Sequence, residues 1–148
     1  MVHALSVMDI LPEKSIEMET EMIMYALEQY QGDHLMLTKQ EVYQLCEKRN
    51  TVLDQCERLE MNGGIIGLLI RKFMDCPYIS QNEFADVMSD LIEVFYTMKN
   101  ECEDLLDDLH LVQKMRTLLN ESHGVMQEMT DAILEYCRSV VAKSVHGK

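Results

Sequence analysis

The sequence predicts an all-α protein, a single-domain bundle of five or six helices around a short apolar central helix. Helix-breaking residues are scarce, with only 2 prolines and 6 glycines among 148 residues, and the unbranched residues that favour helices are common. Apolar residues recur every three or four positions, and β-branched residues never alternate as they would in a strand. The chain has the length of one domain, residues 1–148, and we find no internal repeat or linker.

The first predicted helix covers about residues 13–31. Pro12 suits the first turn of a helix, because its missing N–H would have no partner there. Apolar positions from Ile16 to Tyr30 follow helical spacing. We expect residues 1–11 to form an arm whose apolar side chains could dock across the bundle.

The second predicted helix runs from the Thr38–Glu41 capping box to about residue 60. One face of this helix is apolar. Arg49 falls on that face between Cys46 and Leu53, so it breaks the pattern.

The central element is the third predicted helix, residues 64–75. Its first half is apolar nearly all round, which is typical of a helix buried on most sides. Gly67 would let a neighbouring backbone come close, and Pro77 ends the helix by favouring extended geometry at the residue before it.

The remaining helices are predicted at about 81–103, from 107 or 108 to 121, and 125–143. Ser80 and Glu83 resemble a second capping box, and Asp107 or Asp108 can cap the fifth helix. Residues 144–148 are expected to fray. Short links between long helices predict antiparallel neighbours.

Composition excludes several classes of function. The net charge of −13 repels phosphate groups, so we expect no nucleic-acid partner. The longest uncharged apolar segment, residues 63–70, is too short to span a membrane. No secretion signal is recognisable at residues 1–14. The five cysteines form no Cys-x-x-Cys pair, which favours reduced thiols and a cytoplasmic location.

No motif predicts catalysis, a metal or a cofactor. Asp107-x-x-His110 is the nearest approach to the carboxylate–histidine motif of di-iron bundles, but Asp107 is expected as a helix cap. Glycines 63, 64 and 67 resemble a phosphate-binding loop only loosely, since no Lys-Ser/Thr follows and no strand precedes them. Cys76 follows the electronegative end of a helix, which disfavours a reactive thiolate.

One set of polar residues is a candidate ligand site. Tyr96, Lys99 and Asn100 share a helix face, and with Arg49 and Arg58 they could line a pocket for an anionic ligand between the second and fourth predicted helices. They could instead form a buried structural network, which is the commoner role of a charge within an apolar stripe.

The stretches RLEMNGGIIGLLIRKF, FMDCPYI and LIEVFYTMKNE, followed by DDLHLVQKM, resemble an uncharacterised family of small helical cytoplasmic proteins from Firmicutes, clostridia especially. The resemblance covers about residues 38–115. It implies a bacterial, helical, single-domain protein and supplies no reaction or site residues.

Two functions remain open on the sequence. The leading one is a non-enzymatic interaction or accessory module, binding a protein partner or itself. Methionine-rich helix faces, which include Met18 and Met22, could form an adaptable groove, and the acidic surface would select a partner with basic groups. The alternative is a sensor or enzyme that uses the polar pocket.

Overall fold

The computed structural model describes residues 12–31, 37–59 and 64–146 of the chain. These residues form six α-helices and one short 3₁₀ helix, with no strand among them. The helices are α2 (Pro12–Gln31), α3 (Lys39–Gln55), α4 (Ile65–Phe73), α5 (Phe84–Glu101), α6 (Asp108–Glu121) and α7 (Met126–His146), and the 3₁₀ helix is η1 (Gln81–Glu83). The all-α prediction is confirmed.

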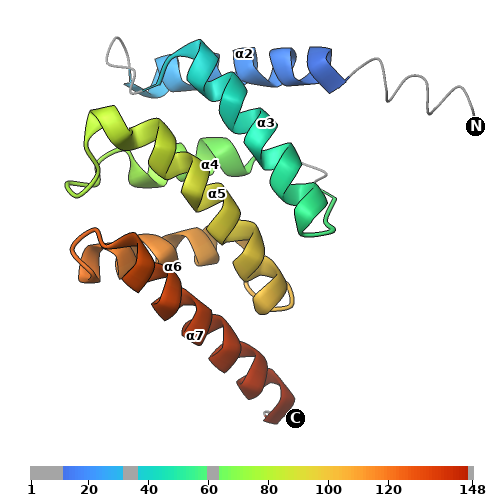
Figure 1. The fold of residues 1–148 in the computed structure, drawn as a ribbon, viewed down its shortest axis with the longest axis vertical. Helices are drawn as coiled ribbons and strands as arrows, with labels where there is room; N and C mark the ends of the chain where they lie inside the picture. The colour runs from blue at the N-terminus through green and yellow to red at the C-terminus, as the bar shows by residue number, and fades with distance from the viewer. Residues whose placement is uncertain (1–11, 32–36, 60–63, 147–148) are drawn as a thin grey trace, which may run out of the picture.

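The helices are arranged as three successive pairs, α2–α3, α4–α5 and α6–α7, stacked on one another (Figure 1). The second helices of the pairs, α3, α5 and α7, lie side by side and run in the same direction. Among the first helices of the pairs, α4 packs against α6. Helix α5 is the best-connected element, since it packs against α3, α4, α6 and α7.

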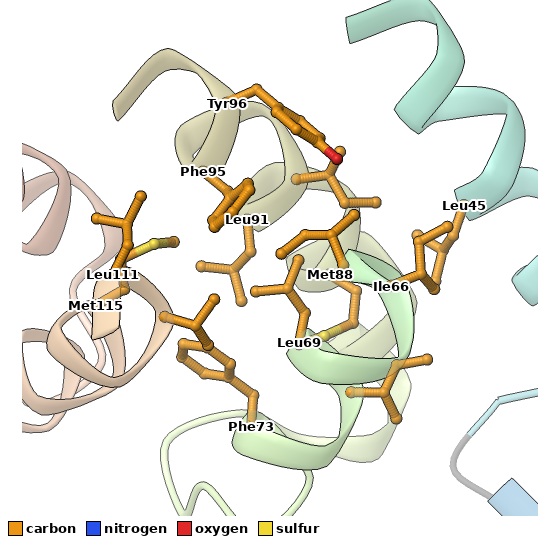
Figure 2. Packing of buried hydrophobic residues seen from close by; sticks show 14 of the residues in the cluster. Leu45, Ile66, Leu69, Phe73, Met88, Leu91, Phe95, Tyr96, Leu111 and Met115 are labelled. Carbon is orange, nitrogen blue, oxygen red and sulfur yellow. The ribbon is translucent and has the colours of Figure 1, made fainter. Parts of the chain in front are cut away.

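The middle of the core lies between α4, α5 and α6, as Figure 2 shows, and the buried cluster extends to residues of α2, α3 and α7. As predicted, α4 is buried on most sides, and Ile66, Leu69 and Phe73 are almost completely inaccessible. They belong to the same buried cluster as Met88 and Leu91 of α5. Burying a side chain of this size contributes on the order of 1.5–3 kcal/mol, so this contact anchors the middle of the stack.

Two of the three predicted helix caps are confirmed. The Thr38 hydroxyl accepts a hydrogen bond from the Glu41 N–H at 3.1 Å, and the Glu41 carboxylate accepts one from the Thr38 N–H at 2.8 Å. Asp107 caps α6 by accepting from the His110 N–H at 2.7 Å. The predicted box at Ser80 is wrong, because its hydroxyl donates to the Glu83 carboxylate at 3.1 Å and η1 begins without a side-chain cap.

Helix α3 ends at Gln55, about five residues before the predicted end. The backbone of Glu57 turns into the left-handed region with φ of 55°. The Glu57 N–H then bonds to the Asp54 carbonyl at 3.2 Å, and the Arg58 N–H bonds to the Leu53 carbonyl at 2.9 Å. These two bonds form a Schellman motif, which stops a helix and satisfies its last carbonyls.

The two chain ends are described only in part. The expected arm, residues 1–11, lies outside the described residues. Helix α7 continues to His146, so residues 144–146 of the expected frayed segment are helical, and residues 147–148 lie outside the described part of the chain.

Candidate functional site

Arg49, one of the five predicted site residues, faces α2 and binds Glu19 there. Its side chain is buried, with 5% of its surface exposed. Its guanidinium binds both carboxylate oxygens of Glu19, through Nη1 and, at 2.6 Å, through Nη2. The side-chain oxygen of its neighbour Asn50 accepts two further bonds at 3.1 Å. Arg49 therefore links α3 to α2 through a two-pronged ion pair.

Burial and Glu19 together set the ionisation of this region. Burial by itself would lower the pKa of Arg49, but the hydrogen bonds and charge of Glu19 outweigh it, so the pKa is raised above its ordinary value. Burial, reinforced by the charge of Glu19, raises the pKa of the adjacent Cys46 thiol to about 11. Arg49 thus stays charged and Cys46 stays a neutral thiol at physiological pH.

The structure brings the other four predicted residues together where α3 and α5 end. Arg58 donates to Asn100 at 2.7 Å, and its guanidinium carbon lies 5.9 Å from the centre of the Tyr96 ring. Asn100 in turn donates to the Cys56 carbonyl at 3.0 Å. Lys99 is buried, and its ammonium group donates to the Leu106 carbonyl at 2.8 Å.

Carboxylates of the same chain complete this cluster. Asp104 accepts two bonds from Arg58, at 2.7 and 3.1 Å, and lies 3.6 Å from the Lys99 ammonium group. Asp108 lies 3.0 Å from the same ammonium group. Hydrogen bonds from Arg58 hold the pKa of Asp104 below its usual value, and the charges of Arg58 and Lys99 act in the same direction.

The backbone explains why Arg58 and Asp104 meet. Helix α5 ends in the same Schellman motif as α3, with Glu103 in the left-handed region and the Asp104 N–H bonded to the Lys99 carbonyl at 2.9 Å. Arg58 and Asp104 occupy the same position, two residues beyond the cap. Because α3 and α5 run in the same direction, their ion pair fastens two equivalent helix ends.

A hollow of about 430 Å³ adjoins this cluster. Asn100 lines it together with Glu57 and Glu101, and no cation is among its described lining residues. Its surroundings are therefore negative, and an anion that reached Arg58 or Lys99 would have to displace Asp104 or Asp108.

A larger hollow lies elsewhere, between α2, α3 and the beginning of α4. We call it the α2–α4 groove. It has a volume of about 780 Å³. Its described lining residues are Ser15, Met18, Glu19, Met22, Ile23, Ala26, Leu27 and Tyr30 of α2, Arg49, Asn50 and Leu53 of α3, and Gly64, Gly67 and Arg71 at α4.

Exposed apolar side chains form the α2 side of the groove. Met18 is 65% exposed, Met22 is 70% exposed and Tyr30 is 61% exposed. The sequence offered one signal for this site, because methionines lay outside the buried stripe of α2. It could not show that α4 would supply the opposite wall.

The residues weighed as metal ligands or nucleophiles have other contacts. Nε2 of His110 lies 3.3 Å from the Tyr136 hydroxyl. Cys76 is buried, with its sulfur 3.9 Å from the Asn120 side-chain oxygen. Across the described ranges, no three His, Cys, Asp or Glu side chains form a group that could hold a metal ion.

None of the helices described combines the length and apolar character needed to cross a membrane.

Comparison with known proteins defines the family. No curated protein matches the chain, and no solved structure matches it. A family model described as a family of unknown function, DUF6323, matches residues 22–146, which include α3 to α7 and the last part of α2. The chain therefore belongs to this family of unknown function.

Proposed function

We propose that the protein is a non-enzymatic interaction module that binds an apolar helical segment in the α2–α4 groove. The observation that carries this proposal is the open apolar face of α2. Helix α2 packs chiefly against α3, and its opposite side presents Met18, Met22 and Tyr30 to solvent. Large exposed apolar side chains around a hollow are characteristic of interaction sites.

Methionine suits such a groove, because its unbranched side chain adapts to partners of different shape. The binding mode would be a helix laid in a groove, with affinity from side chains at every third or fourth position.

Photo-crosslinking in the cells that make the protein tests this proposal. A benzophenone amino acid replaces Met22 in the groove, and in a matched variant it replaces Leu109, an exposed apolar residue of α6. We expect a discrete adduct from position 22 and none from position 109, with the partner identified by mass spectrometry. Equal adducts from both positions, or none from position 22, would contradict the proposal.

The second candidate is an anionic-ligand sensor or enzyme. The observation in its favour is that Arg58, Tyr96, Lys99 and Asn100 do lie together. It ranks second because Asp104 already occupies the cationic groups. Native mass spectrometry of the purified protein separates the two, since a retained small molecule would favour the sensor or enzyme.

The proposal also places the protein in the cytoplasm of a bacterium of the Firmicutes, as the resemblance of the central stretch suggested. Five free cysteines, at positions 46, 56, 76, 102 and 137, support a reducing compartment. Fractionation of the source cells tests this location.

A further inference from the structure

The α2–α4 groove lies where the stacking of helix pairs is incomplete. Between the second and third pairs, α4 packs against α6. Between the first and second pairs, α3 packs against α5, while the groove lies between α2 and the beginning of α4. The apolar side chains that would fill such a seam are present on α2, but within the described chain they face solvent.

The α4 wall of the groove carries two glycines at positions where the described structure has room for a larger side chain. A Cβ atom on Gly64 would have no described atom within 4 Å, and one on Gly67 would meet only the end of the Arg71 side chain, at 3.4 Å. Neither glycine has a positive φ. Glycine inside a helix costs about 1 kcal/mol relative to alanine, so the bare backbone at Gly67 is better explained by an outside surface that packs closely on it.

The groove also differs in charge from the acidic chain as a whole. Its described charged residues are Glu19, Arg49 and Arg71, and Glu19 is already paired with Arg49. Arg71 is exposed and forms no ion pair with a described residue. The local charge is therefore positive in a chain of net charge −13, while Glu17 and Glu21 line a different hollow on the other side of α2.

We infer that a second copy of this chain occupies the α2–α4 groove, so that two copies pair through α2 across a two-fold axis; this rests on the proposed function of the groove. A two-fold contact needs a surface that offers both a ridge and a hollow. The exposed stripe of Met18, Met22 and Tyr25 on α2 supplies the ridge directly beside the groove.

Charge and area fit the same occupant. Two copies of charge −13 repel over most of their surfaces, and this repulsion is weaker at the groove, where Arg71 forms no ion pair with a described residue. Helix α2 has 20 residues and is therefore about 30 Å long. A helix with its side chains is about 10 Å wide. Counting the groove beside α2 as equally wide, the face covers roughly 600 Å² per copy, which is the lower limit for a stable dimer.

Sedimentation equilibrium of the purified full chain, up to about 0.5 mM, tests the inference. We expect a dimer, and we expect Met22→Lys to weaken it about tenfold or more, as removal of a central apolar contact does. Because this change reduces the net negative charge of each copy, the overall repulsion between the two acidic chains cannot explain the loss. The matched control, Leu109→Lys on α6, makes the same change of charge and should leave the dissociation constant within about twofold.

Gly67→Ala separates association from folding. Alanine fits the described chain and favours helix, so the melting temperature should stay the same or rise, while the added methyl group should weaken the dimer several-fold. Higher salt should strengthen dimerisation by screening the like charges of the two copies.

A wild-type monomer at all concentrations would overturn the inference, as would a dimer that Met22→Lys and Gly67→Ala leave intact. The crosslinking experiment at position 22 separates this failure from failure of the proposed function. A monomer that crosslinks there to a different protein keeps the groove as an interaction site and replaces only its occupant. A monomer that forms no adduct would contradict both the dimer and the proposed function of the groove.

Discussion

Removing Arg49 should destabilise the protein because it would strand the carboxylate of Glu19. The side chain of Arg49 is 7% exposed and that of Glu19 is 23% exposed. Breaking a buried ion pair on one side typically costs 3–5 kcal/mol. Since Glu19 keeps some contact with water, we expect Arg49→Met to cost about 2–4 kcal/mol, or roughly 5–15 °C in melting temperature for a domain of this size.

Urea unfolding followed by circular dichroism measures this loss, and two further variants define its cause. In Glu19→Met/Arg49→Met no charge is stranded, so the free energy of unfolding should return to within about 1 kcal/mol of wild type. Glu21→Gln breaks the Lys39–Glu21 pair, which also joins α2 to α3 but is exposed, at 63% and 68%. That change should cost less than about 0.5 kcal/mol.

Hydrogen exchange shows where the loss occurs. Because α2 packs chiefly against α3, Arg49→Met should increase exchange in α2 more than in α5. The reasoning is refuted if Arg49→Met costs no more than Glu21→Gln, or if the double variant is as unstable as the single one. A small-molecule role for Arg49 would instead appear as loss of a bound ligand without loss of stability.

Three further predictions follow from the same structure. Asp104→Asn should cost about 1 kcal/mol at pH 7, allowing for a carboxylate that is 54% exposed. Because the pKa of Asp104 is lowered in the folded state, the difference in urea stability from wild type should be fully present above the unfolded pKa and should shrink as the pH falls through the folded one. A difference that does not shrink with acidification would contradict this. Burial raises the pKa of Cys137 to about 12, whereas Cys56 is only half-buried. Iodoacetamide should therefore modify Cys56 in the native protein long before Cys137, as measured by peptide mapping. Comparable rates of modification would count against the burial of Cys137. Gly124 has φ of 86°, and a Cβ atom there would lie 2.5 Å from the Cβ of Tyr78. Gly124→Ala should therefore cost more than about 1 kcal/mol and lower the melting temperature. An unchanged melting temperature would exclude this backbone strain.

Local patterns predicted most of the helices, because helix formation depends on residues three and four positions apart. The Thr38 capping box and the Asp107 cap were recognisable for the same reason, since each satisfies its donors within one turn. The end of α3 was missed, because a Schellman motif usually carries glycine at the left-handed position and here carries Glu57. The Ser80 box was predicted wrongly, because two side chains that can cap a helix can also bond to each other.

The candidate ligand site was likewise predictable only where its residues lie on one helix. Tyr96, Lys99 and Asn100 could be placed on one helix face from their spacing. Whether Arg49 joined them depended on the direction in which α3 presents it, and α2 contributes the Glu19 that holds it on the other side. The pairing of Arg58 with Asp104 spans 46 positions in sequence and has no local signature.

By itself, the sequence determined that the chain is helical, where most helices begin, that α4 is buried and that the surface is acidic, since each depends on composition or on a repeat within a few residues. Only the tertiary structure decided that α3 and α5 run in the same direction, that Arg58 and Asp104 fasten their ends, and that a groove separates α2 from α4. The physical reason is that the apolar stripe of a helix indicates how much of its surface must be buried but not which neighbouring helix buries it. The exposed methionines of α2 and the bare backbone at Gly67 are each unremarkable in the sequence, and they become a candidate site because the stacking of helix pairs places them on facing walls of one groove.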